Sequence, residues 1–115
     1  MHEAGLMARV LEIAARHAEE AGAGRIRLIA LRVGALSGVE KESLRFAFEA
    51  LKPGTPAREA ELLIEEVPLR GSCEACNIEF AADGLYGIAL CPSCGEPVAA
   101  VAAGEELEIS YLEVI

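Results

Sequence analysis

The sequence predicts an α+β fold in which two helices pack on a three-stranded sheet, with a cysteine-rich segment inserted before the last strand. Two observations predict the helices and the sheet. Apolar residues recur at helical spacing in two segments, and branched apolar residues fill three others. The third observation is that all four cysteines fall between residues 70 and 97, where core-forming side chains are few.

The first helix is expected over residues 3–21. Its apolar stripe consists of Leu6, Met7, Val10, Leu11, Ala14 and Ala18. Glu3 in the first turn complements the positive end of the helix dipole. The glycines at positions 22 and 24 end the helix, and a strand follows over residues 25–33.

The second helix is expected after a loop at residues 34–40 and runs to about Leu51. Its stripe consists of Leu44, Ala47, Phe48 and Leu51. The segment from Ser37 to Glu40 matches the S-x-x-E capping box, in which Ser37 caps the helix and Glu40 reaches back to the Ser37 amide. Two further strands are expected over residues 61–67 and 106–114, and the Ala-rich stretch 99–103 reads as a strand or a connection.

Composition limits the size and the partners of the protein. The 115 residues are 53% hydrophobic but only 4% aromatic, so the core is small and a structural metal would help it. The net charge of −9 argues against nucleic acid and anionic membranes as partners. There is no apolar run of roughly 20 residues and no signal-peptide pattern at the start, so we expect a cytoplasmic protein.

The cysteines form two C-x-x-C pairs, Cys73 with Cys76 and Cys91 with Cys94, separated by fourteen residues. Two such turns bring four thiolates onto one tetrahedral zinc ion. Four protein ligands leave no open position, so this zinc is expected to be structural and to hold together a zinc-ribbon insert. The sequence then divides into a discontinuous α/β domain, 1–69 with 98–115, and the insert, 70–97. Disulfides and a redox C-x-x-C are the alternatives.

The N-terminus offers a second set of metal ligands. The Met1 amine, the His2 amide and the His2 imidazole lie together, and such nitrogen donors suit Ni(II) and Cu(II). On its own this pattern is weak, because a histidine at position 2 is usually just an exposed residue. His17 lies within the first helix, where we expect a structural or surface role.

Three features together resemble the HypA/HybF family of nickel metallochaperones: the opening Met1-His2-Glu3, the stretch 34–43 with Val39-Glu40-Lys41, and the paired C-x-x-C insert. The resemblance covers essentially the whole chain. It implies delivery of Ni(II) during maturation of [NiFe]-hydrogenase and, in some organisms, urease. It also implies that the protein is not an enzyme.

The resemblance further implies the site residues and the partners. Nickel is bound by the Met1 amine and His2, with Glu3 and Glu40 as further candidates, while Cys73, Cys76, Cys91 and Cys94 hold zinc. For Glu40 the capping box remains an equal alternative. The implied partners are a HypB-type GTPase, the hydrogenase large-subunit precursor and, where urease is the client, urease accessory proteins. The protein could be a monomer or a homodimer.

Three other classes of protein are alternatives to this interpretation. A zinc-ribbon adaptor would act through protein or nucleic-acid contacts alone, but no Lys or Arg follows Arg70, which disfavours nucleic acid. A thiol redox protein would need reactive cysteines of low pKa. An enzyme is the least favoured class, because His17 is the only interior histidine and no nucleophile constellation can be built around it.

Overall fold

The computed structural model describes residues 2–35, 37–82, 89–98, 101–104 and 107–115. The chain divides into two compact units. The first consists of Met1–Leu31, Val39–Glu65 and Glu108–Ile115, and the second of Arg32–Gly38 and Glu66–Leu107. Each unit has its own secondary structure, so each is described separately.

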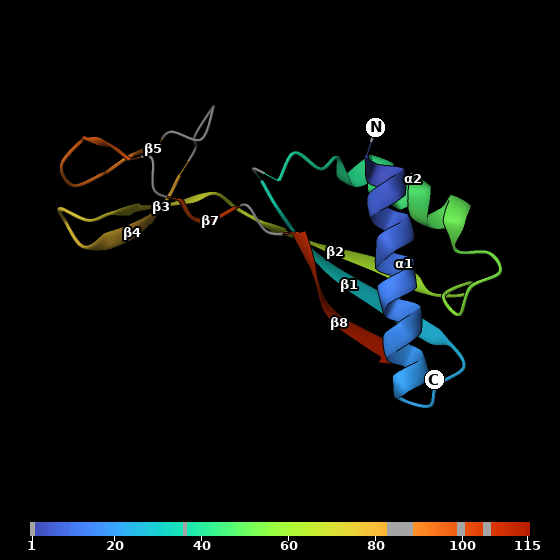
Figure 1. Ribbon diagram of the computed structural model, residues 1–115. Helices are drawn as coiled ribbons and strands as arrows, with labels where there is room; N and C mark the ends of the chain where they lie inside the picture. Colours follow the sequence, from blue (N-terminus) through green and yellow to red (C-terminus); the bar gives the residue numbers. More distant parts are fainter. Residues whose placement is uncertain (1, 36, 83–88, 99–100, 105–106) are drawn as a thin grey trace. The chain divides into compact units, whose positions relative to one another are not determined.

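The first unit contains both helices and most of a three-stranded sheet. The helices are α1 (Glu3–Glu20) and α2 (Lys41–Leu51), and the sheet has the order β2 (Glu61–Val67), β1 (Ile26–Gly34), β8 (Leu107–Val114). Both helices lie on the same side of the sheet (Figure 1). This arrangement confirms the predicted α+β fold. Within the described residues, neither helix combines the length and the apolar character needed to span a membrane.

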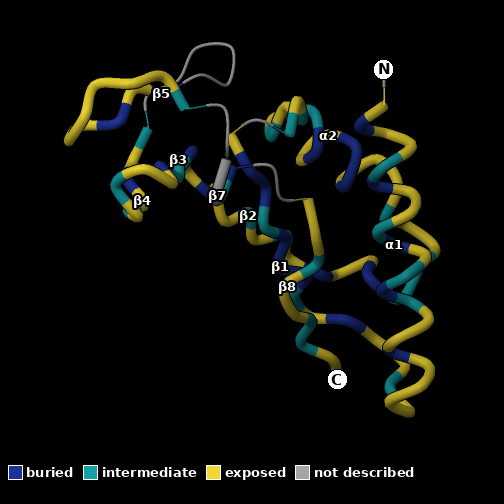
Figure 2. The backbone as a smooth tube through the Cα atoms, turned by 60° about the vertical axis from the view of Figure 1, so that its left-hand side comes forward, coloured by how far each residue is buried: buried dark blue, intermediate teal, exposed yellow. Residues whose placement is uncertain are grey.

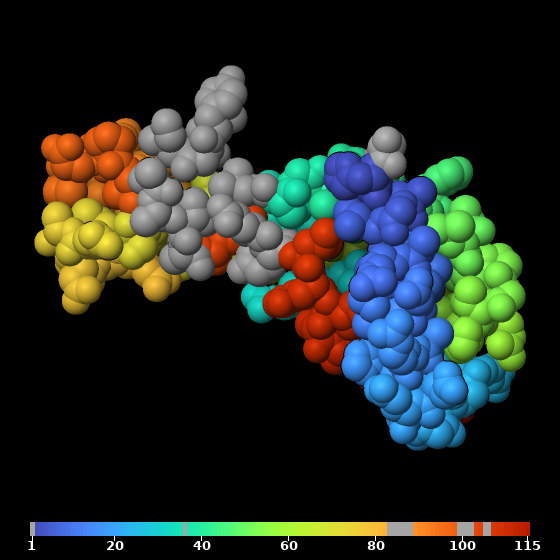
Figure 3. Space-filling model, viewed as in Figure 1, coloured from blue at the N-terminus to red at the C-terminus, as the bar shows by residue number. Residues whose placement is uncertain are grey.

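The core of this unit follows most of the stripes read from the sequence, but Leu6 and Val10 are half-buried and Leu51 is exposed. On α1 the buried residues are Glu3, Met7, Leu11, Ala14 and Ala18, and on α2 they are Leu44, Ala47 and Phe48. Buried positions recur along α1 in Figure 2. The opposite side of α1 lies at the surface along the length of the helix, as the space-filling view shows (Figure 3). One polar residue, Glu3, therefore starts an otherwise apolar stripe.

The start of α2 differs from the predicted capping box. Glu40 is itself the N-cap residue, and its Oε1 accepts a hydrogen bond from the Glu42 backbone N–H at 3.1 Å. Ser37 lies three residues before this N-cap, and its backbone N–H, which the capping box would pair with Glu40, donates to the Gly34 carbonyl at 3.0 Å. Gly38, with a positive φ of 77°, turns the chain between these two residues, and the helix begins at Lys41, directly after the predicted loop.

The second unit contains strands that periodicity did not reveal. A three-stranded sheet has the order β4 (Ile78–Ala81), β3 (Arg70–Cys73), β7 (Val101–Ala103), and β5 (Ala89–Leu90) pairs with β6 (Pro97–Val98). The pairs β3–β4, β3–β7 and β5–β6 are all antiparallel. The expected strand or connection at 99–103 is a strand over Val101–Ala103, while residues 99 and 100 lie outside the described part of the chain.

Candidate metal centres

The four cysteines come from two similar hairpins of the second unit. Cys73 ends β3, and Cys76 lies in the turn before β4, next to Asn77 with its positive φ of 56°. Cys91 follows β5, and Cys94 lies in the turn before β6. Each hairpin thus presents two thiols from one tight turn, as the C-x-x-C spacing requires.

The second hairpin is closed by its own backbone. The Gly95 N–H donates to the Cys91 carbonyl at 2.8 Å, and the Cys91 N–H donates to the Glu96 carbonyl at 3.0 Å. Gly95 has a φ of 75°, a conformation that glycine adopts without strain. These bonds fix the turn in a shape that holds both thiols on one side.

The four sulfur atoms converge on one point. Among the described residues, these thiols form a cluster whose ligand atoms all lie within 4.8 Å of one another. The Sγ atoms of Cys73 and Cys94 are 3.8 Å apart. A tetrahedron of thiolates with Zn–S bonds near 2.3 Å has edges of about 3.8 Å. All four cysteines are free thiols, so the paired-disulfide alternative does not describe this structure.

The neighbouring thiols affect one another's ionisation. A hydrogen bond from the Cys94 backbone N–H is the main cause that lowers the pKa of Cys91 to about 7. Hydrogen bonding to Cys94, together with burial, raises the pKa of Cys76 to about 12. A bound divalent cation would instead allow all four sulfurs to be thiolates.

The second set of candidate ligands lies at the start of α1. His2 is the residue that precedes the helix, its side chain makes no capping hydrogen bond, and 61% of that side chain is exposed. Its Nε2 lies 3.8 Å from Oε2 of Glu3, and the same Oε2 accepts a hydrogen bond from the Glu40 backbone N–H at 3.0 Å. The structure thus brings His2, Glu3 and Glu40 together. Met1, the fourth residue predicted for this site, lies outside the described residues.

The burial of Glu3 was not anticipated from the sequence. Its side chain is only 4% exposed, although an acid in a first helical turn usually faces solvent. The hydrogen bond from Glu40 is the main cause that lowers the pKa of Glu3, and it acts against burial, which raises it. The sequence contains a pattern that could have predicted this burial. Glu3, Met7 and Leu11 are spaced four residues apart, so Glu3 begins the buried stripe of α1.

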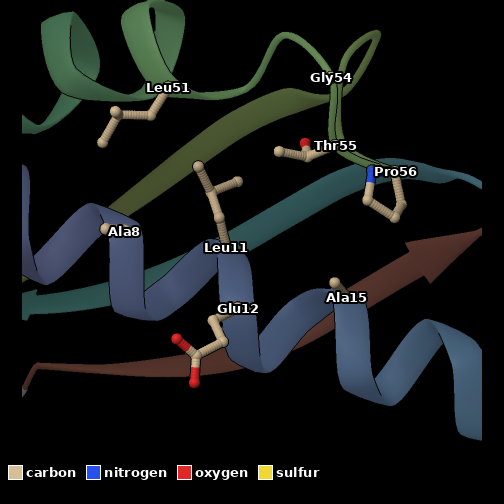
Figure 4. A pocket seen from close by; sticks show the side chains of 8 residues that line it. All are labelled: Ala8, Leu11, Glu12, Ala15, Leu51, Gly54, Thr55 and Pro56. Atoms are coloured by element: carbon tan, nitrogen blue, oxygen red, sulfur yellow. The ribbon is translucent and has the colours of Figure 1, made fainter.

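His17 and a hollow beside α1 lie apart from these two sets of candidate ligands. His17 lies on the exposed side of α1 with its Nδ1 3.6 Å from Glu20, which fits the surface role expected for it. A hollow of about 350 Å³ lies between α1 and the segment after α2 (Figure 4). Its lining residues are Ala8, Leu11, Glu12, Ala15, Leu51, Gly54, Thr55 and Pro56. The one acid among them, Glu12, pairs with Arg9 and Arg16.

The fold defines a small protein built from an α+β unit and a unit in which four cysteine thiols are grouped closely enough to hold a metal ion. A profile of the family described as "Hydrogenase/urease nickel incorporation, metallochaperone, hypA" matches residues 1–114. The chain therefore belongs to the HypA family of nickel metallochaperones, which act in hydrogenase maturation by carrying metal rather than by catalysing a reaction.

Individual relatives agree with this assignment. The chain is 42% identical over 113 residues to the hydrogenase maturation factor HypA of Chloroflexus aggregans, covering 98% of each chain. It is 45% identical over 109 residues to that of Chlorobaculum tepidum, covering 95% of each. Two solution structures, each 24% identical, share the fold. One is titled HypA protein and has a TM-score of 0.75, with 100% of this chain and 97% of that chain covered. The Ni metallochaperone HypA from Helicobacter pylori has a TM-score of 0.70, with coverages of 100% and 98%.

Proposed function

We propose that this chain binds Ni(II) at its N-terminus, through the Met1 amine and His2, and delivers the ion during maturation of [NiFe]-hydrogenase or, in some settings, urease. The observation that carries this proposal is the exposed His2 imidazole, free of any capping bond, at the first turn of α1 in a chain of this family. Imidazole and amine nitrogens are donors that Ni(II) favours in tetragonal geometry.

The position of the site suits a carrier that must release its cargo. A ligand set at an exposed chain end is reached easily by a partner protein, whereas a closed cage of four thiolates is not. Glu3 and Glu40 were both candidate nickel ligands. We place the buried Glu3 carboxylate behind His2, and the Glu40 carboxylate, which caps α2, beside the ion. Protons compete with nickel for His2 and the amine, so affinity falls as pH falls.

We further propose that Cys73, Cys76, Cys91 and Cys94 hold a structural zinc ion. The convergence of their sulfur atoms, the tetrahedral edge length and the absence of disulfides among them support this assignment. When bound, zinc would supply a cross-link between the two hairpins. In this proposal residues 70–97 are the zinc-binding insert, and residues 1–69 with 98–115 are the nickel-binding domain.

The proposed partners are a HypB-type GTPase, the hydrogenase large-subunit precursor and, where urease is the client, urease accessory proteins. The net charge of −9 supports protein partners rather than nucleic acid or an anionic membrane. Free thiols in a metal-binding arrangement support a reducing compartment, so we place the protein in the cytoplasm.

The test is calorimetric titration of Ni(II) into zinc-loaded protein with an untagged N-terminus. We expect one bound nickel in the parent and none in His2→Ala, with the zinc content unchanged in both. His17→Ala is the matched control, because the His2 and His17 side chains are each 61% exposed and both lie on or next to α1. Equal binding by the parent and His2→Ala, or no binding by either, would overturn the N-terminal site.

A further inference from the structure

The four cysteines of the second unit differ in their exposure to solvent. Cys73 and Cys91 are buried, Cys76 is half-buried, and Cys94 is exposed. The two buried cysteines belong to the core cluster of this unit, and Cys76 packs against that cluster. Three of the four thiols are therefore covered at least in part by the core. A reagent dissolved in water reaches the fourth, Cys94, most easily.

The turn that carries Cys94 is exposed throughout. Every residue from position 92 to position 97 is exposed. Gly95, the next residue, has no side chain, and its φ of 75° lets its N–H reach the Cys91 carbonyl. In the first hairpin the equivalent cysteine, Cys76, packs against the core cluster instead. Equivalent positions of two similar hairpins thus differ in access to solvent.

Backbone hydrogen bonds to sulfur add to this difference. The sulfur of Cys91 accepts hydrogen bonds from the backbone N–H groups of Cys94 and Ser93, whereas the sulfur of Cys94 accepts one from the Glu96 N–H. The thiolate is the form of cysteine that attacks electrophiles. An N–H donor stabilises the thiolate and makes it a weaker nucleophile. Within the second hairpin, both burial and hydrogen bonding therefore favour Cys94 as the more reactive sulfur.

A second thiol lies within reach of the exposed one. The Sγ atoms of Cys73 and Cys94 are 3.8 Å apart. A disulfide joins two sulfurs at about 2.05 Å, so a movement of about 2 Å would connect them. Cys73 ends β3 in the first hairpin, and Cys94 lies in the second hairpin. A disulfide between them would link the two hairpins at the place where zinc is proposed to link them.

We propose that Cys94 is the first cysteine of this cluster to react with hydrogen peroxide and other soft electrophiles, and that Cys73 then forms a disulfide with it. The Cys94 sulfur attacks one peroxide oxygen, the O–O bond breaks, and hydroxide leaves, so that Cys94 becomes a sulfenic acid. The Cys73 sulfur attacks the Cys94 sulfur and displaces the second hydroxide. The peroxide gains two electrons, each sulfur loses one, and both hydroxides take a proton from solvent.

This reaction consumes two of the four proposed zinc ligands, so the site loses its ion. The inference rests on the proposed zinc site and adds the order in which its ligands react and the product that they form. Exposed cysteines placed beside a second cysteine are the ones that respond to oxidants in other proteins. The second unit would accordingly release zinc when peroxide reaches the hairpin turn at Cys94.

The first arm of the test maps alkylation of the zinc-loaded parent by substoichiometric iodoacetamide. Trypsin would leave all four cysteines on one peptide, because no Lys or Arg follows Arg70. A glutamate-specific protease instead separates Cys73 from Cys76 and leaves Cys91 with Cys94 on a third peptide. Tandem mass spectrometry distinguishes the last two. We expect most of the label on Cys94, and first labelling of any other cysteine would overturn the proposal.

The second arm treats the zinc-loaded parent with hydrogen peroxide and follows zinc release with a colorimetric chelator. The remaining thiols are then blocked with N-ethylmaleimide before digestion. A disulfide between Cys73 and Cys94 joins two of the glutamate-specific peptides, whereas one between Cys91 and Cys94 stays within a single peptide. We expect the joined peptides to appear as zinc is released. A disulfide within either C-x-x-C pair would overturn the role assigned to Cys73.

Two matched variants test the order of reaction. Cys94→His and Cys76→His each replace one thiol at equivalent hairpin positions by another zinc ligand, and three cysteines with one histidine form a common zinc site. Peroxide should release zinc at least about tenfold more slowly from Cys94→His, because the exposed thiolate is gone, and within about twofold of the parent's rate from Cys76→His. Equal rates in the two variants would overturn the proposal.

Metal analysis before peroxide separates this inference from the proposed function. A parent that binds no zinc would overturn the proposed zinc site, and the alkylation map would still test whether Cys94 reacts first. If a histidine variant does not bind zinc, the two peptide maps of the parent decide the question without it.

Discussion

The ring of Phe80 lies against the backbone of Gly71 at paired positions of β3 and β4. A Cβ atom at position 71 would stand 2.7 Å from Cζ of Phe80, closer than side chains tolerate. Phe80 is 8% exposed and packs in the same buried cluster as Cys73 and Cys91. A methyl group at position 71 would therefore displace a core ring that belongs to the same buried cluster as two of the cysteines.

We expect Gly71→Ala to destabilise the second unit by about 1–3 kcal/mol, the usual effect of overpacking a core. The measurement is the rate of zinc release to a chelator, combined with thermal unfolding of the zinc-loaded protein. Gly5→Ala is the control, because nothing lies within 4 Å of its Cβ and alanine favours the helix. Equal zinc release from the parent and Gly71→Ala would show that Phe80 moves aside freely.

Phe46 and Phe48 lie two residues apart on α2 and differ completely in burial. Phe48 is 1% exposed, and Phe46 is 77% exposed. Phe48→Ala should lower the free energy of unfolding by about 3–5 kcal/mol through lost burial and a residual cavity. Phe46→Ala should change it by less than about 0.5 kcal/mol. Urea denaturation followed by the helical circular dichroism signal compares them, and similar losses in both variants would contradict the burial seen here.

Glu40 caps α2 through a hydrogen bond to the Glu42 N–H. Glu40→Ala removes the cap and should lower stability by about 0.5–2 kcal/mol, whereas Glu40→Asn should keep most of it, because asparagine is a good N-cap. Denaturation measures the loss of stability in Glu40→Ala and its retention in Glu40→Asn. Nickel titration of both variants should still give one bound ion. Loss of that ion in the well-capped Glu40→Asn would mean that the carboxylate is an essential nickel ligand.

The lowered pKa of Glu3 makes the first unit sensitive to acid. The folded state favours the ionised carboxylate, so its contribution is fully present above the unfolded value of about 4.3 and is lost as pH falls through the lower folded value. We therefore expect the stability difference between the parent and Glu3→Gln to be constant near neutral pH and to shrink in acid. Denaturation of both proteins from neutral pH to about pH 3 tests this. A stability difference that grows in acid would mean that folding raises the pKa of Glu3 instead of lowering it.

Cys91→Ala should lose zinc and unfold the second unit, because it removes one proposed ligand and one buried member of the core cluster. Metal analysis gives the zinc content, and NMR amide dispersion gives the folded state of each unit. Ser93→Ala, an exposed position between Cys91 and Cys94, should keep its zinc. A full zinc content in Cys91→Ala would contradict the four-cysteine assignment.

The parts of this structure that followed from the sequence are those set by a regular period or a fixed spacing. The stripe through Met7 and Leu11 located α1, and the two C-x-x-C pairs indicated that their thiols would meet. Both signals are local, since a helix repeats its face every few residues and a C-x-x-C turn closes on itself.

The parts that did not follow depend on contacts between distant residues. The short strands of the second unit have too few residues to show an alternation, and β7 pairs with β3 across about thirty residues of chain. The helix α2 begins directly after the predicted loop, but the predicted cap was wrong, because Glu40 is the N-cap and the Ser37 backbone N–H donates to the Gly34 carbonyl. The burial of Glu3 depends on the Glu40 amide, which lies 37 residues away in the sequence.

The buried cluster of the second unit consists of Cys73, Phe80, Ala89 and Cys91, so two of its four members are proposed metal ligands. A core of this kind contains few apolar contacts that could stabilise it without the proposed metal ion. Chelators, oxidants and competing thiol-seeking ions would all act on its folding through the same four atoms. The folded fraction of this unit would then rise and fall with the free zinc concentration around it, as for any ligand that binds only the native state.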